Sequence, residues 1–362
     1  MNQILTEGKM IRKIINKKTI TILSLLLIIS SFVFVNIDSL AGFGLVQNTE
    51  DKTKSEDVEV FIESNRATYS KTLIDKFKAA QEKIVNLRKK KTQTIQLSEN
   101  DLYSNNVCLM NAKTGEIIYA IKENEVVFPA SLTKMMTTLV AVDEIKNYDQ
   151  IQPITEELYT SMIADDASMA GYLPNEKINL RDLIYGTMLP SGGEASVGLA
   201  EGCSGSEAAH VAKMNEKAKE IGLRRTNFMN VSGLHDPKNY STAKEMAEIV
   251  RYGLQDETFA KIFTIPHYIS SQTEEHPDGV YMMYSVLAYM DSAPSEGFKI
   301  LGGKTGYTEQ AGLCLASTAI VGDEQYILVT LGALPYDAGS KFHFEDAVTI
   351  YRRLAETKSE IQ

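Results

Sequence analysis

The hydrophobic pattern divides the chain into three stretches. Residues 19–37 carry no charge, and their centre, residues 20–35, is almost wholly apolar. A polar stretch follows over residues 42–97, and only after it do apolar residues recur at the periods of helices and strands. The third stretch holds about 260 residues, enough for one large two-lobed domain. The pattern therefore predicts a terminal apolar segment, a spacer and one globular domain.

The globular stretch carries both helix and strand patterns. Residues 135–142 form a largely apolar run behind a proline, which is typical of the start of a buried helix. Residues 312–320 and 326–333 indicate successive strands, joined through Gly-Asp-Glu at residues 322–324. A last helix is predicted over residues 344–356. We expect the two strands to form a hairpin beside a third strand that precedes them.

Positive charge flanks the N-terminal apolar run. Five basic residues lie before it: Lys9, Arg12, Lys13, Lys17 and Lys18. A positive flank followed by an apolar run is the signal that places the rest of the chain outside the cytoplasm. The run lies between the lengths typical of a signal peptide and of a spanning helix, and Ser39-Leu40-Ala41 could serve as a cleavage site. We favour an uncleaved anchor over residues 1–41, because no C-terminal membrane helix would otherwise hold the protein at the membrane.

Residues 42–97 indicate an extracytoplasmic spacer. Residues 47–57 are acidic and lack a core pattern, which predicts disorder. Five later apolar positions follow a 4-3-4-3 spacing: Leu73, Phe77, Ala80, Ile84 and Leu87. This spacing predicts one amphipathic stalk helix that ends in the basic run 88–91 and is too short to indicate a coiled-coil dimer.

Charge and cysteine usage narrow the class of protein. The formal net charge of −10 argues against nucleic-acid binding. The three cysteines cannot all pair, and we expect Cys108 and Cys314, in predicted strands, to be buried apolar residues without a structural disulfide. Cys203 lies near a predicted helix start. His210, seven residues on, could share its face, but we interpret it as a surface histidine.

Three short strings in the globular stretch carry the candidate chemistry. They are Ser131-Leu132-Thr133-Lys134, Ser191-Gly192-Gly193 and Lys304-Thr305-Gly306. The first is S-x-x-K, the third is K-T-G, and a serine motif lies between them in chain order. Each string alone is common in proteins. Together, in this order, they are the signature set of acyl-serine enzymes.

Local context supports a nucleophile and its base in the first string. Ser131 falls in the first turn of the predicted helix, where free N–H groups and the helix dipole stabilise negative charge. Lys134 lies one turn further on the same face, and it can act as a base only when it is neutral. Burial and a neighbouring cation, for which Lys304 is the candidate, would both lower its pKa.

With these motifs the chain resembles the low-molecular-mass penicillin-binding proteins, the serine-type D-alanyl-D-alanine carboxypeptidases. The similarity runs from about residue 98 to about residue 354 and includes residues 110–119, which resemble the family's first hairpin. It implies an α+β fold of the β-lactamase/transpeptidase type. An antiparallel sheet would pack against helices and a helical subdomain, with the active site in the cleft between. We therefore expect the catalytic domain over residues 98–357 and a short tail at residues 358–362.

The resemblance also implies the catalytic roles. Ser131 would be the nucleophile, Lys134 its general base, and Ser191 the relay that passes a proton to the leaving amine. The backbone N–H groups of Ser131 and Tyr307 would form the oxyanion hole. No metal and no cofactor is implied.

The same resemblance implies the substrate-binding residues. Lys304 and Thr305 would bind the terminal carboxylate of the substrate, and Gly306, Tyr307 and Gly193 would line the substrate site. The implied partners are peptidoglycan stem peptides, with β-lactams as inhibitors, no nucleic acid, and the membrane through the N-terminal segment.

Gly193 is the main departure from the family pattern. The middle motif is usually S-x-N, and its asparagine offers a side-chain amide that glycine lacks. We therefore expect that Gly193→Asn restores a hydrogen bond and speeds acylation. A second departure is that residues 332–335 lack the arginine that many members carry after the K-T-G hairpin.

Together these features predict a serine-type D-Ala-D-Ala carboxypeptidase outside the cytoplasm, held at the cell membrane or secreted to the cell wall if its N-terminal segment is cleaved. The expected reaction removes the terminal D-alanine from a stem peptide through an acyl-serine intermediate, and β-lactams would acylate the same serine. One alternative is a serine β-lactamase, although no Glu-x-x-Leu-Asn string lies between Lys134 and Lys304. The other alternative is a catalytically weak wall-binding homologue, because Gly193 replaces the asparagine of the S-x-N motif.

Overall fold

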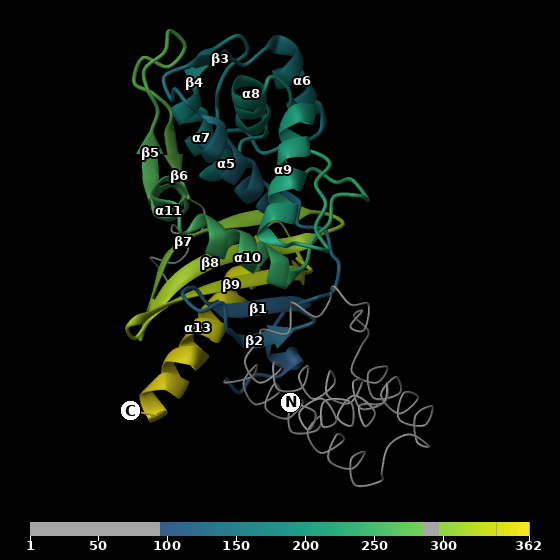
Figure 1. Ribbon diagram of the computed structural model, residues 1–362, viewed down its shortest axis with the longest axis vertical. Helices are drawn as coiled ribbons and strands as arrows, with labels where there is room; N and C mark the ends of the chain where they lie inside the picture. Colours follow the sequence, from purple (N-terminus) through teal and green to yellow (C-terminus); the bar gives the residue numbers. More distant parts are fainter. Residues whose placement is uncertain (1–94, 285–296, 338, 362) are drawn as a thin grey trace, which may run out of the picture. The chain divides into compact units, whose positions relative to one another are not determined.

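The computed structural model describes residues 95–284, 297–337 and 339–361 (Figure 1). The predicted N-terminal segment 1–41 and the stalk helix predicted around residues 73–87 lie outside the described residues. Within the described part of the chain, no helix combines the length and the apolar content that a membrane span requires.

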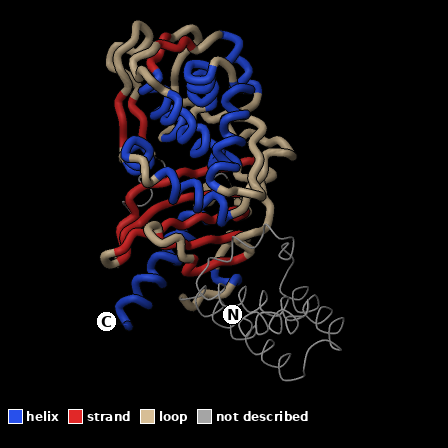
Figure 2. The backbone as a smooth tube through the Cα atoms, in the orientation of Figure 1, coloured by secondary structure: helices blue, strands red, loops and turns tan. Residues whose placement is uncertain are grey.

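A five-stranded antiparallel sheet, whose strands are red in Figure 2, forms the centre of the domain. Its strand order is β2-β1-β9-β8-β7, with the strands labelled in Figure 1. Its strands are β1 (Asn106–Asn111), β2 (Ile117–Ile121), β7 (Phe298–Thr308), β8 (Gly312–Val321) and β9 (Glu324–Ala333). The two hairpins expected from the sequence, β1–β2 and β8–β9, are both present. Gly322 makes the tight β8–β9 turn at φ 61°, a conformation that favours glycine.

Helices cover both faces of this sheet (Figure 1). One face packs on α13, whose bounds are Phe342–Ile361, around a core that includes Leu315, Leu328 and Tyr351. The predicted last helix is therefore longer than residues 344–356, and residues 358–361, expected to form a tail, belong to it. Residues 357–360 are polar, and Lys358 Nζ holds this last part of the helix to β9 through Glu324 and the Tyr326 hydroxyl.

The other face carries the helical lobe, and the two layers confirm the predicted α+β fold. Its helices are α5 (Thr133–Glu144), α6 (Glu156–Ala164), α7 (Leu180–Met188), α8 (Gly193–Ser204), α9 (Glu207–Ile221), α10 (Ala243–Gly253) and α11 (Glu257–Thr264). Side-chain oxygens of Asn179, Ser206 and Thr242 cap the starts of α7, α9 and α10. Two small two-stranded sheets complete the lobe: β3 (Ile151–Pro153) with β4 (Lys177–Asn179), and β5 (His267–Ile269) with β6 (Tyr281–Met283).

Candidate active site

Ser131 and Lys134 meet at the start of α5. The expected single helix begins with a short 3-10 turn, Ala130–Leu132, which holds Ser131, and α5 follows from Thr133. Lys134 Nζ lies 3.2 Å from Ser131 Oγ. Ala130 has a φ of 48°, an uncommon conformation for a residue with a Cβ, directly before Ser131. The serine and the lysine are therefore placed as the spacing predicted.

Lys134 is buried, with an exposed fraction of 3%. Its Nζ also donates a hydrogen bond to the carbonyl of Ser232 at 2.5 Å. Burial lowers the pKa of Lys134 to about 7, while the negative charge of Glu194 acts in the opposite direction. A substantial fraction of Lys134 is therefore neutral near neutral pH, as a general base requires.

Ser191 and Lys304 form a second pair. Lys304 Nζ donates to Ser191 Oγ at 2.8 Å and to the carbonyl of Thr305 at 2.8 Å. Burial, followed by the nearby charge of Lys134, holds the pKa of Lys304 well below its usual range. The charge of Lys134 therefore lowers the pKa of Lys304. At Lys134, burial alone lowers the pKa. Ser191 has a φ of 67°, which is uncommon for serine and places strain at this motif.

Two glycines allow other backbone segments to approach Ser131. A Cβ at Gly306 would lie 2.9 Å from the backbone nitrogen of Ser131, and a Cβ at Gly233 would lie 2.0 Å from the carbonyl oxygen of Ala130. Both positions therefore require glycine. The glycine of the K-T-G string lets β7 pass directly beside the serine, while Tyr307, next along β7, is 54% exposed.

The structure changes the expectation for Gly193. This residue is buried at the first position of α8, and its N–H donates to the carbonyl of Ser168 at 2.6 Å. A Cβ there would lie 2.9 Å from Ala167 Cβ and 3.0 Å from Met162 Sδ. The space in which an asparagine side chain would begin is therefore filled by the loop that faces α8. A faster Gly193→Asn variant is no longer expected.

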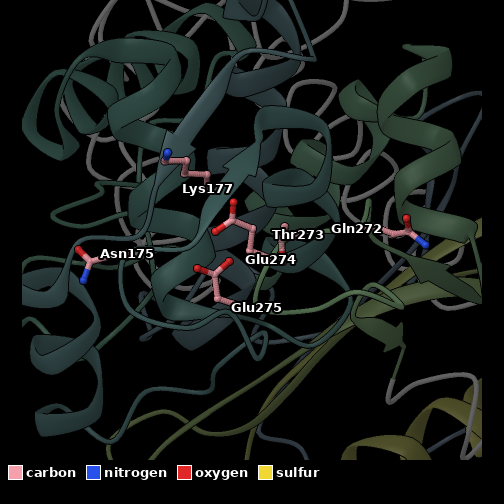
Figure 3. Close-up of a pocket in the computed structure, with 6 residues that line it drawn as sticks. All are labelled: Asn175, Lys177, Gln272, Thr273, Glu274 and Glu275. Atoms are coloured by element: carbon pink, nitrogen blue, oxygen red, sulfur yellow. The ribbon is translucent and has the colours of Figure 1, made fainter.

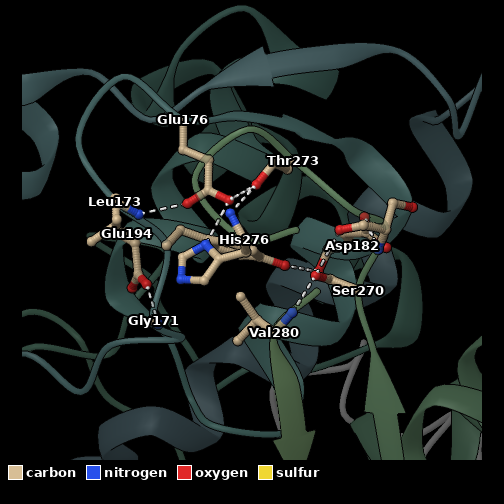
Figure 4. A network of polar contacts seen from close by, with 11 residues as sticks. Gly171, Leu173, Glu176, Asp182, Glu194, Ser270, Thr273, His276 and Val280 are labelled. Carbon is tan, nitrogen blue, oxygen red and sulfur yellow. Dashed lines mark hydrogen bonds and ion pairs between the residues drawn. The ribbon is translucent and has the colours of Figure 1, made fainter. Parts of the chain in front are cut away.

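Glu194 is a buried charge that the sequence reasoning did not single out. Its Oε1 accepts hydrogen bonds from the N–H groups of Ala170 at 2.6 Å and Gly171 at 3.1 Å (Figure 4). Its Oε2 is buried without a hydrogen-bond partner, and burial raises its pKa. Glu194 thus fixes the facing loop against the start of α8 and is also the carboxylate whose charge acts on Lys134.

The carbonyl that binds Lys134 belongs to a loop that two helices hold in place. Thr137 Oγ1, on α5, donates to the carbonyl of Val231 at 2.8 Å. The N–H of Val231 donates to Glu207 Oε1, on α9, at 3.1 Å. Because Val231 precedes Ser232, these two bonds position the Ser232 carbonyl against Lys134 Nζ.

His210 differs from its sequence interpretation, whereas Cys203 lies near a helix start as expected. Cys203 is in the last turn of α8, just before α9 begins, and His210 is fully buried rather than on the surface. His210 Nε2 lies 3.0 Å from the carbonyl of Thr137 and donates to it, so Nδ1 is the acceptor that faces Ser204 Oγ at 2.9 Å and Cys203 Sγ at 3.4 Å. Burial lowers the pKa of His210 to about 4 and raises that of Cys203 to about 11. This cluster is therefore a neutral network that ties α5, α8 and α9 together.

A separate polar pocket of about 410 Å³ contains none of the predicted site residues (Figure 3). It is lined by Asn175, Lys177, Gln272, Thr273, Glu274 and Glu275. Beside it, buried Glu176 accepts from Thr273 Oγ1 at 2.6 Å and pairs with His276 Nδ1 at 2.9 Å (Figure 4). These contacts fix the loop before β6 to the loop before β4. Across the described residues, no group of three or more His, Cys, Asp or Glu side chains could hold a metal ion.

Comparison with known proteins finds both a matching family and similar individual proteins. A family profile described as D-alanyl-D-alanine carboxypeptidase matches residues 71–334. The chain is 34% identical over 231 residues to D-alanyl-D-alanine carboxypeptidase DacF of Bacillus subtilis, which covers 62% of this chain and 56% of that protein. It is 27% identical over 263 residues to a D-alanyl-D-alanine endopeptidase of Pseudomonas aeruginosa. This match covers 72% of this chain and 79% of that protein.

A solved structure agrees with these sequence matches. The crystal structure of the Streptomyces K15 DD-transpeptidase superimposes with a TM-score of 0.62 at 25% identity, over 70% of this chain and 98% of that chain. The chain spans just over half the length of DacF, and nearly the whole of the K15 structure is matched.

Proposed function

This chain belongs to the D-alanyl-D-alanine carboxypeptidase family, and we propose that it removes the terminal D-alanine from peptidoglycan stem peptides through an acyl-serine intermediate. One observation carries the proposal: Ser131 Oγ lies 3.2 Å from a buried lysine whose pKa is lowered to about 7. A serine hydroxyl becomes a nucleophile when such a base lies within reach.

The proposed reaction begins with Lys134. Neutral Lys134 takes the proton of Ser131 as Oγ attacks the carbonyl between the two terminal D-alanines. The N–H groups of Ser131 and Tyr307 stabilise the oxyanion. Ser191 passes its proton to the nitrogen of the leaving D-alanine as the C–N bond breaks, and the proton held by Lys134 then replaces it. Neutral Lys134 next takes a proton from water, whose oxygen attacks the acyl carbon. The Ser131–acyl bond breaks, the shortened peptide leaves as an acid, and Lys134 returns the proton to Ser131 Oγ.

Lys304 has two roles in the proposed reaction. Its bond to Ser191 Oγ orients the relay serine. Together with the Thr305 hydroxyl, its Nζ binds the carboxylate of the substrate, whose negative charge raises the lowered pKa of Lys304 and favours the protonated form. Burial makes this attraction stronger than it would be in water. β-Lactams, which carry a comparable carboxylate and a reactive amide, acylate the same serine and leave it slowly.

A second candidate is an endopeptidase that cuts a D-alanyl cross-link. The P. aeruginosa endopeptidase matches this chain over 79% of its own length, whereas DacF matches over 56%. Both reactions use the same nucleophile and differ in the leaving group.

One assay separates these activities. Purified full-length protein is incubated with a stem pentapeptide, a cross-linked muropeptide and a chromogenic cephalosporin. Release of free D-alanine supports the carboxypeptidase, and loss of cross-links without free D-alanine supports the endopeptidase. Rapid, repeated hydrolysis of the cephalosporin alone would favour a β-lactamase. No turnover of any substrate would reject all three.

We also propose that residues 1–41 anchor the protein in the cell membrane, with the catalytic domain outside the cytoplasm. The positive flank and the apolar run support this orientation. The native protein should remain with membranes after a high-salt wash. Mass spectrometry that finds a mature chain beginning at Gly42 would contradict an uncleaved anchor.

A further inference from the structure

Three aromatic residues from distant parts of the chain meet on the surface, and we refer to Tyr103, Tyr336 and Phe342 as the aromatic cluster. The Phe342 ring stacks on Tyr103 with 4.1 Å between centroids and meets Tyr336 edge-on at 5.1 Å. Tyr336 is 88% exposed, Tyr103 is 47% exposed, and neighbouring Leu334 is 70% exposed. Aromatic rings that pack on one another and remain this exposed to solvent indicate a surface suited to a binding partner.

The aromatic cluster and the C-terminal end of β7, the strand that carries the K-T-G string, lie at the same end of the sheet. Tyr307, near the end of β7, pairs with Leu313 of β8, and Leu313 pairs with Ala333, the last residue of β9. Leu334 follows directly. Tyr103 precedes β1, which lies on the far side of β9. Neighbouring strands are about 4.8 Å apart, so roughly 10 Å, measured across the strands, separates Tyr307 from the end of β9, and the aromatic cluster lies just beyond that end.

The proposed function sets the direction in which a substrate lies along β7, and the present inference rests on it. The terminal carboxylate binds at Lys304 and Thr305, and the scissile carbonyl faces the N–H of Tyr307. The rest of the stem peptide therefore continues past Tyr307, toward the end of β7. Three further residues reach about 10 Å when extended. The sugar to which a stem peptide is attached then lies beyond the end of β7. The glycan strand that continues from this sugar can cross the ends of β8 and β9 to the aromatic cluster.

We propose that the aromatic cluster binds the glycan strand that carries the stem peptide. The C–H faces of a sugar ring are apolar and stack on aromatic rings, while its hydroxyl and acetamide groups can bond to tyrosine phenols. The surrounding loop supplies further polar groups, since exposed Asp337 and half-buried Ser340 lie beside Tyr336. The enzyme would thus recognise a stem peptide together with the strand to which it is joined.

The cluster suits a glycan better than a membrane or a second copy of the chain. The net charge of −10 disfavours an anionic lipid surface, which attracts clustered lysines and arginines. A stable dimer buries about 800 Å² on each partner, much more than three rings provide. A sugar chain matches both the size and the mixed polarity of the cluster.

The test measures binding of the full-length protein to purified glycan strands from which an amidase has removed the stem peptides. Tyr336→Ala should weaken binding by roughly 2- to 10-fold, the range for one lost aromatic contact. The double variant with Tyr103→Ala should weaken it further. Tyr281→Ala is the matched control, because Tyr281 is 61% exposed on β6, outside the cluster. It should bind as the unchanged protein does.

Several outcomes would overturn the proposal. Equal glycan binding by the unchanged protein and by Tyr336→Ala, with matching melting temperatures, would do so. So would loss of vesicle binding or of self-association in the double variant while glycan binding persists, since these results would assign the cluster to a membrane or to a second copy. Running the assay in Ser131→Ala protein separates it from the proposed function, because glycan binding needs no turnover.

Discussion

Lys134 illustrates how single residues set the chemistry of this site. Among the residues that the structure describes, its polar contacts are a hydroxyl and a backbone carbonyl, and no carboxylate of this part of the chain binds its Nζ directly. An ammonium group that is buried without a paired charge is costly, so the neutral form gains and the pKa falls to about 7. The same burial that stabilises the helical lobe therefore produces the base.

The pH dependence of acylation tests this view. Lys134 is active when neutral, so acylation should rise as the pH rises through about 7. Lys134→Arg should be nearly inactive, because a guanidinium keeps its proton throughout this range. Rates of acylation by a β-lactam, measured from pH 5 to pH 10, give the profile. An acidic limb near the ordinary lysine pKa of about 10.4, or near-normal acylation by the arginine variant, would rule out Lys134 as the base.

Gly193 gives a second prediction at this scale. Because the position of a Cβ is already filled, Gly193→Asn should acylate no faster than the unchanged protein and should lose about 1–3 kcal/mol of stability through overpacking. Ala167→Gly removes the nearest atom, so the double variant should regain much of that stability. Denaturant melts and acylation rates provide both readouts. A Gly193→Asn variant that is stable and clearly faster would show that its amide does enter the substrate site.

Residue type and spacing made Ser131, Lys134, Ser191 and Lys304 predictable, because each role needs a particular side chain. The Ser232 carbonyl was not predictable in the same way. Every residue has a carbonyl, and this one lies 98 positions from Lys134. Glu194 could have been noticed, since a carboxylate directly after Ser-Gly-Gly enters the first turn of a helix.

At the scale of elements, three segments carry the residues of the site: the turn before α5, the start of α8 and strand β7. The apolar run after Lys134 made α5 visible in the sequence, and the two runs at residues 312–320 and 326–333 made the hairpin beside β7 visible. The start of α8 was not predicted. The 3-10 turn at Ser131 and the loop around Val231 were not predicted either, because tertiary contacts with Gly306, Gly233 and Glu207 define them.

Glu207 is a positioning residue whose effect can be measured. Glu207→Ala should release Val231, let the Ser232 carbonyl move from Lys134, and slow acylation by up to roughly 10-fold. It should also shift the acidic limb of the pH profile, which a purely structural loss would not do. Glu207→Gln keeps an acceptor oxygen and should restore most of the rate. Glu216→Ala, on an exposed position of α9, is the control.

Should Glu207→Ala and Glu216→Ala acylate equally fast with the same pH profile, the loop would not position Lys134. Failure of Glu207→Gln to restore the rate would instead indicate that the charge of Glu207, rather than its hydrogen bond, matters.

At the scale of the whole molecule, the order of strands explains why the site lies where it does. β7 is at one edge of the five-stranded sheet, so its outer side is not paired within that sheet. An extended peptide can add to such an edge through backbone hydrogen bonds. The fold class was predictable from the family resemblance. The contacts that close the helical lobe over β7 were not, since they depend on glycines whose neighbours are distant in sequence.

Covalent labelling of Ser131 tests the central claim most directly. Full-length protein is exposed to a fluorescent penicillin, and the labelled residue is mapped by mass spectrometry. The account predicts one label on Ser131, its complete loss in Ser131→Ala, and a normal melting transition for that variant. A folded Ser131→Ala protein that is still labelled, with the label on another residue, would contradict it.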